Sequence, residues 1–187
     1  MAFYSEEELQ VIGFKKLGKS VKVSNKSSIY RPHEIEIGDY SRIDDFCLLS
    51  GKIRIGRNVH LAAYSNVSAG ECSVTFEDFS GLAYGCHVFT GSDDYTGKTL
   101  TNPTVPLEYK GLSEDDVVLG RHVIVGTNSI VFPGVHIATG CSIGAFTMVT
   151  KSTKPWGVYF GIPAKRIKER KKDLLVLEAQ YIMDESQ

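Results

Sequence analysis

The sequence predicts an all-β solenoid, in which short strands wind into stacked coils of triangular cross-section. The first observation is a period of six residues between apolar positions, which recurs along three stretches of the chain. The positions are Ile37, Ile43, Leu49, Ile55, Leu61 and Val67, then Phe76, Leu82 and Val88, then Leu119, Val125, Val131, Ile137, Ile143 and Val149. A helix repeats its apolar residues at intervals of about three and four, and a hairpin at about two, so neither fits a strict six.

Two further observations support the coil. A small or β-branched residue follows most of these positions four residues later, as Ser41 and Val123 do, which gives two inward positions in every six. Glycine directly follows several of them, as Gly38 does, where a tight corner leaves no room for a side chain. Three faces of six residues make an 18-residue coil, which buries its apolar side chains only by stacking on other coils.

The coils are expected over residues 23–160, with two interruptions. Between Val67 and Phe76 the step is nine residues, so Glu71 and its neighbours are expected to bulge from a corner. Residues 93–116 lack the repeat and are rich in Thr, Pro, Gly and charge. Loops of this length in compact domains are usually functional or disordered.

Both ends of the chain are expected to be helical. Ser5 and Glu8 form a capping-box pattern ahead of an apolar run that ends at Gly13, so residues 1–22 are assigned to an N-terminal helical cap. Pro163 opens a segment of spaced apolar residues among charges, which predicts a C-terminal helix over 161–187 that lies on the solenoid. Residues 1–187 therefore form a single domain.

Composition excludes several classes of protein. The chain has 187 residues, with 42% hydrophobic and 23% charged residues, which argues against disorder and against a membrane-inserted protein. A net charge of −1 gives no basic surface for nucleic acid. The acidic start of the chain does not read as a signal peptide, so a cytoplasmic location is expected. The four cysteines have no CxxC pairing and are expected to fill the core.

The hexads and the segment from Val117 to Arg170, with its Gly-x-Pro-Ala-Lys exit, resemble the hexapeptide-repeat acyltransferases. The resemblance covers nearly the whole chain and implies a left-handed parallel β-helix. The hand rests on the resemblance alone, because nothing in the spacing of the hexads determines it. It also implies a homotrimer that uses acetyl-CoA, or another short acyl-CoA, with active sites between neighbouring solenoids. No metal, nucleic acid or membrane insertion is implied.

Cofactor-binding residues follow from the same resemblance. Thr127 and Ala145 occupy the positions along which the family lays the pantetheine arm, and the backbone N–H of a corner such as Gly126 would polarise the thioester carbonyl. Lys151, Lys165 and Arg166 occupy the positions that bind the CoA phosphates, with Lys168 nearby. Phosphate groups need such cations, although the lysines could also simply solvate a helix.

The chain departs from its O-acetylating relatives in the loop. Where they carry a catalytic His-Pro pair, an ungapped alignment from Leu82 to Val88 places Asp93, with Asp94 next to it. A sugar hydroxyl benefits from an imidazole base, whereas a free amine is already nucleophilic and mainly needs orientation and the loss of a proton. A carboxylate suits an amine, so Asp93 and Asp94 are the first candidates to hold it and take its proton.

The S-D-D-Y and L-T-N-P-T-V-P segments, the N-terminal IGFKKLGK and the PWGVYFGIPAKR exit resemble acyltransferases of bacterial surface-sugar (O-antigen) pathways. Among these are enzymes that acylate the amino group of dTDP-4-amino-4,6-dideoxyglucose. The resemblance therefore implies N-acylation of a nucleotide-linked amino sugar, by direct attack on the thioester.

Several alternatives remain open at this point. His60 or His87 could serve as the base of a sugar O-acetyltransferase, with Glu71 near His60, and Asp44 and Asp45 could contact a sugar or be turn residues. The sequence identifies no histidine partner for Cys86 or Cys72, which disfavours an acyl-enzyme intermediate. The same solenoid hosts the gamma-class carbonic anhydrase, but the five histidines here contain no close pair to bind zinc. An inert scaffold would need neither the cationic exit nor the acidic loop.

Overall fold

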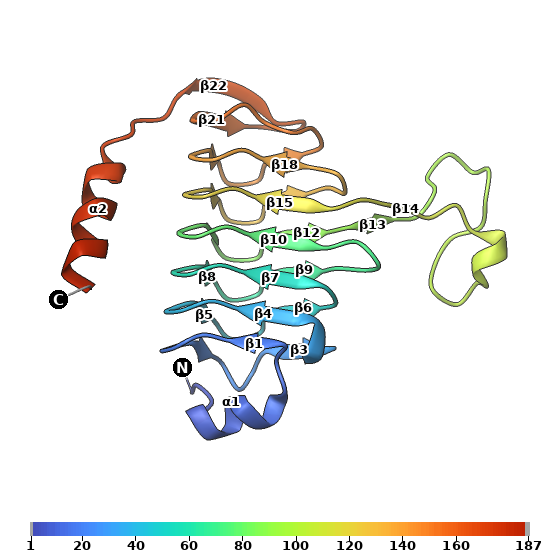
Figure 1. Cartoon of the computed structure of the whole chain (residues 1–187). Helices are drawn as coiled ribbons and strands as arrows, with labels where there is room; N and C mark the ends of the chain where they lie inside the picture. The colour runs from blue at the N-terminus through green and yellow to red at the C-terminus, as the bar shows by residue number, and fades with distance from the viewer. Residues whose placement is uncertain (1, 186–187) are drawn as a thin grey trace.

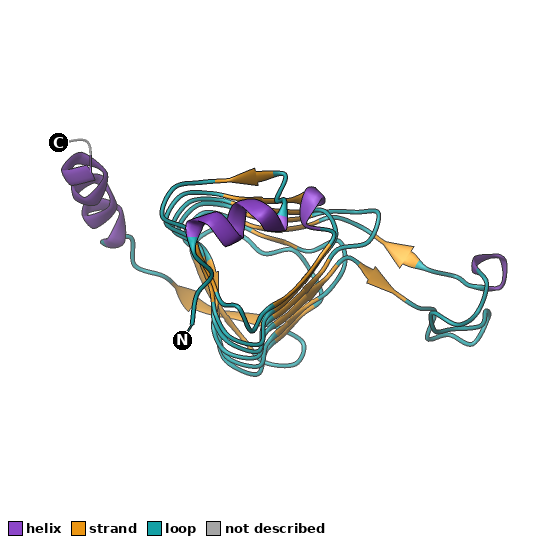
Figure 2. Ribbon diagram, turned by 90° about the horizontal axis from the view of Figure 1, so that it is seen from below, coloured by secondary structure: helices purple, strands orange, loops and turns teal. Residues whose placement is uncertain are grey.

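The computed structural model describes residues 2–185 and is a left-handed parallel β-helix with a helix at each end (Figure 1). The three predicted faces are three parallel sheets, which form a triangle when the stack is viewed along its axis (Figure 2). We name the edges corner 1–2, corner 2–3 and corner 3–1, after the sheets that meet there in chain order.

Sheet 1 has six strands: β1 (Lys16–Leu17), β4 (Ile35–Ile37), β7 (Ile53–Ile55), β10 (Val74–Phe76), β15 (Val117–Leu119) and β18 (His136–Ile137). Sheet 2 has eight: β2 (Lys22–Val23), β5 (Arg42–Ile43), β8 (His60–Leu61), β11 (Gly81–Leu82), β16 (Ile124–Val125), β19 (Ser142–Ile143), β21 (Gly157–Phe160) and β22 (Lys165–Glu169). Sheet 3 has six: β3 (Ser28–Tyr30), β6 (Leu48–Ser50), β9 (Asn66–Ser68), β12 (His87–Phe89), β17 (Ile130–Val131) and β20 (Met148–Val149).

The predicted inward positions form one continuous core. Every aliphatic or aromatic position of the six-residue period is at most 3% exposed, and Phe76 is the largest side chain among the fully buried ones. The small positions between them, such as Ser41 and Val123, are buried as well. Gly38 confirms the crowded corner, because a Cβ there would lie 2.6 Å from the backbone carbon of Gly56 in the next coil.

Corners 1–2 and 2–3 carry unexpected ladders of large side chains in the left-handed backbone region. Tyr40, Asn58, Phe79 and His122 occupy this conformation at corner 1–2, and Phe46, Tyr64, Asn128 and Phe146 do so at corner 2–3. Such φ values are uncommon for bulky residues, so the stacked coils must impose them. Phe46 stacks on Tyr64 with ring centroids 5.1 Å apart, and Phe79 stacks on His122 at 5.4 Å.

The N-terminal capping box is confirmed. Helix α1 (Glu6–Ile12) begins after Ser5, whose hydroxyl accepts from the Glu8 N–H, and it ends at Gly13 in the left-handed conformation. The stack itself starts earlier than predicted, because β1 lies within residues 1–22 and β2 begins at Lys22, and the two strands extend sheets 1 and 2. Helix α1 lies across this end of the stack (Figure 2).

The predicted C-terminal helix over 161–187 is wrong in its first part. Lys165–Glu169 is strand β22, antiparallel to β21, and helix α2 (Leu174–Glu185) begins only afterwards, while residues 186 and 187 lie outside the described part. The unpaired N–H and C=O groups of β21 need partners at the end of the stack, and a strand supplies them where a helix could not. Ile167 is the only apolar side chain of β22, so no apolar alternation reveals it in the sequence.

The two predicted interruptions both leave from corner 3–1. Residues 70–73 bulge there, between β9 and β10. The long loop leaves between β12 and β15, and it starts and ends in a short antiparallel hairpin of β13 (Gly91–Ser92) and β14 (Ser113–Glu114). Two 3-10 turns, at Pro32–Glu34 and Leu107–Tyr109, complete the structure. The loop projects from one side of the solenoid, and α2 stands on the other (Figure 1).

Candidate active site

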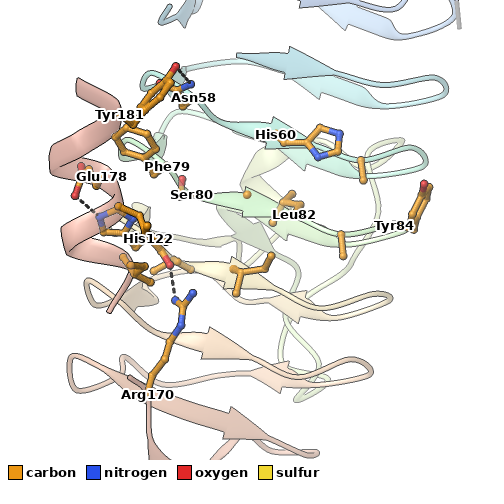
Figure 3. A pocket seen from close by; sticks show the side chains of 17 residues that line it. Asn58, His60, Phe79, Ser80, Leu82, Tyr84, His122, Arg170, Glu178 and Tyr181 are labelled. Atoms are coloured by element: carbon orange, nitrogen blue, oxygen red, sulfur yellow. Dashed lines mark hydrogen bonds and ion pairs between the residues drawn. The ribbon is translucent and has the colours of Figure 1, made fainter. Parts of the chain in front are cut away.

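A groove of about 660 Å³ lies between the outer face of sheet 2 and helix α2 (Figure 3). Its floor comes from β8, β11 and β16, and Leu174, Leu177 and Tyr181 of α2 lie opposite. Gly81 hollows the floor, because its register neighbours on either side are His60 and Ile124, whose side chains point outward. A Cβ at Gly81 would lie 2.8 Å from the carbonyl oxygen of His60, so the position has no room for one.

Polar contacts at corner 1–2 fix α2 over this groove. Glu178 accepts from Arg121 Nε at 2.9 Å and lies 2.8 Å from His122 Nε2, and the Asn58 amide donates to the Tyr181 hydroxyl at 3.1 Å. Burial acts to raise the pKa of Glu178, but the hydrogen bonds from Arg121 and His122 outweigh it and hold that pKa below its ordinary value. Helix α2 is therefore held in place by its polar side chains, while its apolar side chains form the wall of the groove opposite sheet 2.

His60 stands in the groove beside a buried carboxylate. Its Nε2 lies 2.9 Å from Asp44 Oδ2, and the other oxygen of Asp44 accepts from Arg42 Nε at 2.6 Å. Asp44 is 2% exposed, whereas the His60 side chain is half-exposed. Asp44 therefore has an ion-pair partner and is held in place by contacts with Arg42 and His60. Its interpretation from sequence as a turn residue did not predict these contacts.

The two loop carboxylates differ sharply. Both oxygens of Asp94 are occupied by hydrogen bonds from the N–H groups of Thr96, Lys98 and Thr99 and from the Thr99 hydroxyl, at 2.8 to 3.2 Å. Hydrogen bonds from Thr96 are the largest cause that lowers the pKa of Asp94 to about 2. Asp94 therefore holds the turn of the loop, and its low pKa makes it a weak base.

The Asp93 carboxylate accepts fewer hydrogen bonds than that of Asp94. Its Oδ2 accepts from the Asn102 N–H at 3.1 Å, and its Oδ1 faces Lys110 Nζ at 3.4 Å. Within residues 2–185 this buried Oδ1 accepts no hydrogen bond besides that ion pair. A carboxylate oxygen with lone pairs to spare can accept a hydrogen bond from an incoming ammonium.

Glu71 lies at the same corner as the base of the loop. It forms an ion pair with Lys52, Nζ to Oε2 at 3.1 Å, and its side chain is largely exposed. The bulge packs on the loop base through the Gly70 N–H, which donates to the Thr90 hydroxyl. His60 belongs to sheet 2, so one chain does not bring Glu71 and His60 to the same corner.

The predicted cofactor residues gather at the far end of corner 2–3. A Cβ on Gly126 would lie 2.6 Å from the Ala145 nitrogen, and the Phe146 N–H donates to the Thr127 carbonyl at 2.9 Å, so these positions stack in successive coils. The Gly126 N–H, however, donates to the Ile143 carbonyl at 2.8 Å. It serves the strand ladder and is not free to polarise a thioester, which corrects that part of the prediction.

Two of the three predicted cations lie beyond this corner along the stack axis. Lys165 and Arg166 are on β22, two strands past β19, whereas Lys151 follows β20 of sheet 3 and so lies at corner 3–1. Arg166 donates to Glu169 Oε1 at 2.6 Å and to the Pro155 carbonyl, while Lys151 and Lys165 are exposed. These positions leave at least the two lysines open to an anionic ligand.

Comparison with known proteins gives the family. No protein-family model matches the sequence. The chain is 40% identical, over 97% of its length and 95% of the relative's, to a dTDP-4-amino-4,6-dideoxy-D-glucose acyltransferase of Escherichia coli. The chain belongs to this family of acyltransferases.

Solved structures agree with this assignment. AntD, an N-acyltransferase from Bacillus cereus in complex with dTDP and 3-hydroxybutyryl-CoA, matches the whole of both chains with a TM-score of 0.98 and 42% identity. A variant of AntD in complex with dTDP-4-amino-4,6-dideoxyglucose and coenzyme A matches 98% of both chains with a TM-score of 0.97 and 44% identity. A maltose O-acetyltransferase from Clostridium difficile, at 21% identity and a TM-score of 0.55, shares the fold alone.

The cysteines of the acyltransferase do not suit covalent catalysis. Cys86 is fully buried, its Sγ lies 3.1 Å from the Gly126 carbonyl, and burial raises the pKa of its thiol. Burial, followed by the nearby carboxylate of Asp116, raises the pKa of Cys72 as well. Neither cysteine has the electropositive surroundings that would stabilise a thiolate.

Two features of the described chain bear on membranes and metals. No helix within residues 2–185 has the length and hydrophobicity to span a bilayer. The same residues contain no cluster of three or more His, Cys, Asp or Glu side chains arranged to hold a metal ion.

Sequence reasoning missed the wall of the groove formed by α2 and the exit segment. Arg170 donates to the carbonyls of His122, Gly140 and Cys141 at 2.6 to 3.2 Å, and burial lowers its pKa. One sequence signal was available for Asp44: the equivalent positions of the other coils from β2 to β19 are Ser24, Ala62, Ala83, Gly126 and Gly144. A carboxylate where the repeat uses only small residues marks an exception that needs a reason.

Proposed function

We propose that this acyltransferase moves the acyl group of acetyl-CoA, or of a slightly longer acyl-CoA, to the 4-amino group of dTDP-4-amino-4,6-dideoxyglucose. The observation that carries the proposal is the match over the full chain, the long loop included, to a protein that binds dTDP with an acyl-CoA. The product would serve surface-polysaccharide (O-antigen) synthesis, and both substrates suit a cytoplasmic enzyme.

The chemistry is direct attack in a ternary complex. The sugar nitrogen forms a bond to the thioester carbonyl carbon, the C–S bond then breaks, and coenzyme A leaves as a thiolate that takes a proton. Asp93 holds the amine through Oδ1 and takes the proton that the nitrogen loses after attack, because a nitrogen with four bonds cannot form a stable amide. Asp94 shapes the loop that presents Asp93.

Acyl-CoA lies along corner 2–3 in this proposal. Thr127 and Ala145 offer backbone groups and a shallow surface to the pantetheine arm, and the exposed Lys151 and Lys165, with Arg166, attract the phosphates. Gly126 contributes close approach rather than its N–H, which is already used. The thioester carbonyl would need a donor from elsewhere in the site.

We further propose a homotrimer in which sheet 2 of one copy faces sheet 3 of the next. The exposed ladder at corner 2–3 supports this arrangement, since Phe46, Tyr64 and Phe146 are each at least half exposed on the isolated chain. A closed ring of three copies would bury these rings where neighbouring copies meet. Its grooves would then open between the loop of one copy and α2 of another.

The test is release of free CoA thiol when the purified protein meets acetyl-CoA and dTDP-4-amino-4,6-dideoxyglucose, beside a 4-hydroxy sugar nucleotide and a simple galactoside. Turnover with the amine alone supports N-acylation. Silence with the amine and turnover with a hydroxyl acceptor would replace the proposal with sugar O-acetylation.

The Asp93→Asn variant tests the base in the same assay. We expect kcat/KM to fall by roughly 100-fold or more, the usual contribution of a positioned acid or base. A change within about threefold, or under ~0.7 kcal/mol, would remove Asp93 from that role. Glu108→Gln, an exposed carboxylate of the same loop, is the matched control.

A further inference from the structure

His60 and Asp44 form a pair that the proposed reaction has not yet used. Asp44 lies outward on sheet 2, at a position that the other coils from β2 to β19 fill with Ser, Ala or Gly, yet it is buried. Its cover comes from Arg42, which itself lies against the Phe3 ring at 5.3 Å, and from the imidazole of His60. Burying a carboxylate is costly unless it is paired, so its place in a repeat of small residues needs an explanation.

The hydrogen bond selects the tautomer of a neutral imidazole at His60. An ionised carboxylate can only accept, so the His60 Nε2, at 2.9 Å from Asp44 Oδ2, carries the proton of that contact. The lone pair of a neutral ring is then on Nδ1. The His60 side chain is 51% exposed and lines the groove, so the imidazole is within reach of a ligand bound there (Figure 3).

The position of His60 relative to Asp93 decides how both could act on one substrate. His60 is on sheet 2 and lines the groove under α2, whereas Asp93 is on the loop that leaves corner 3–1. Loop and helix stand on opposite sides of the same solenoid, so a single chain does not bring the two side chains together. A ring in which sheet 2 of one copy faces sheet 3 of the next would place the loop of the second copy at the groove of the first.

We propose that His60, oriented by Asp44, is a catalytic residue of the acyltransferase and shares each site with Asp93 of the partner subunit. This inference rests on the proposed function. His60 Nδ1 takes one proton from the sugar ammonium: an N–H bond of the substrate breaks, an Nδ1–H bond forms, and the nitrogen regains the lone pair that attacks the thioester. The departing thiolate later takes the imidazolium proton, which returns His60 to its starting state, and Asp93 releases to solvent the second proton that the nitrogen lost.

Asp44 acts through His60 and is therefore a positioning residue. It holds one ring nitrogen, so that the other keeps its lone pair and its direction. The Asp44→Asn variant should lower kcat less than loss of the imidazole does, with KM for acyl-CoA unchanged.

The first experiment measures thiol release by three histidine variants against the wild type. His60→Ala should lower kcat by roughly 100-fold, and added imidazole should restore part of it, because the truncation leaves space for the free base. His60→Gln keeps an N–H donor for Asp44 but has no basic nitrogen, so it should match the wild type in unfolding temperature and stay inactive with or without imidazole. His136→Ala is the matched control, since His136 is also an exposed first residue of its strand but lies on sheet 1.

The second experiment tests whether the site is shared. Chains carrying His60→Ala and chains carrying Asp93→Asn are co-expressed with different tags, and assemblies with both tags are purified. If each site takes one residue from each of two chains, every trimer that carries both tags has one intact site of its three and should show about a third of wild-type turnover. If both residues of a site come from one chain, no site is intact and the mixture stays inactive.

The outcomes separate the two proposals. Wild-type turnover with the amine, together with a His60→Ala variant within about threefold of it, overturns the role of His60 and leaves the proposed function standing. Loss in His60→Ala without recovery in the mixed assemblies overturns the sharing between subunits. No wild-type turnover with the amine overturns the proposed function, and this inference falls with it.

Discussion

The stacked coils and the loop over 93–116 belong to one chain but are stabilised in different ways. The coils bury every predicted inward side chain to at most 3% exposure. The loop contains no buried residue, and all its leucines and tyrosines are exposed: Tyr95, Leu100, Leu107, Tyr109 and Leu112. Its order comes from carboxylates, with Asp94 holding three backbone N–H groups and Asp93 holding one more.

The difference shows how the solenoid can carry a specific site. Stacked burial makes a rigid body that tolerates an insertion at a corner, because each coil needs only its neighbours above and below. The inserted loop is then free to keep its apolar surface for a ligand or a second copy. Stability and recognition are thereby assigned to different residues, and mutations in the two regions should have separable effects.

The largest expected effect on stability is in the core. Phe76→Ala should lower the free energy of unfolding by about 3 to 5 kcal/mol, because Phe76 is 1% exposed and truncation leaves a cavity between coils. Tyr95→Ala, at a loop side chain that is 93% exposed, should leave it within about 0.5 kcal/mol of the wild type. Chemical denaturation of both variants measures this, and equal losses would show that the loop is part of the cooperative unit.

The core was accessible from sequence because the information is local and repeated. Each inward residue recurs at the same interval, so one wrong assignment does not disturb the pattern. Strand β22 was missed for the opposite reason: its place depends on the open edge of β21, while its own sequence from Lys165 to Glu169 carries four charges around Ile167. The left-handed corner residues also show no pattern, since Phe, Tyr, Asn and His alternate there.

The next largest effect concerns the loop alone. Asp94→Asn removes a charged acceptor from the turn over Thr96–Thr99, so trypsin should cleave after Lys98 faster than in the wild type, on the order of tenfold. The midpoint of global unfolding should not move, because the coils do not rest on this turn. Asp93→Asn serves as the comparison, and equal cleavage rates in both variants would contradict the division of roles between the two carboxylates.

Acid should open the same turn in the wild type. The pKa of Asp94 is lowered from 3.8 to about 2 by the hydrogen bonds it accepts, so its contribution is complete above pH 3.8 and is lost as the pH falls through about 2. Amide resonances of Thr96 and Thr99 followed by NMR from pH 5 down to pH 2 should report this. In Asp94→Asn the same resonances should be insensitive over that range, and a transition that persists there would have to come from another group.

The candidate site was only half accessible from sequence, again for physical reasons. Asp93 and Asp94 are adjacent and chemically identical, so only their hydrogen bonds, 4 for one and 1 with an ion pair for the other, separate a structural role from a chemical one. The groove wall depends on contacts between residues far apart in the chain, such as Asn58 with Tyr181. No local pattern encodes such a contact.

The smallest expected effect is at the end of the stack, where α1 takes the place of a further coil. Ser5→Ala removes the acceptor of the Glu8 N–H, which lies 3.2 Å from the hydroxyl, and should cost about 1 kcal/mol of helix stability. Leu9, 2% exposed, anchors the helix to the core, so the helix should remain docked and fray at its first turn. Hydrogen exchange should therefore quicken at residues 6–8, with little change in β1. Faster exchange in β1 as well would mean that the helix and the first coil open as one unit, and that the helix is a structural continuation of the coils rather than a separate cover.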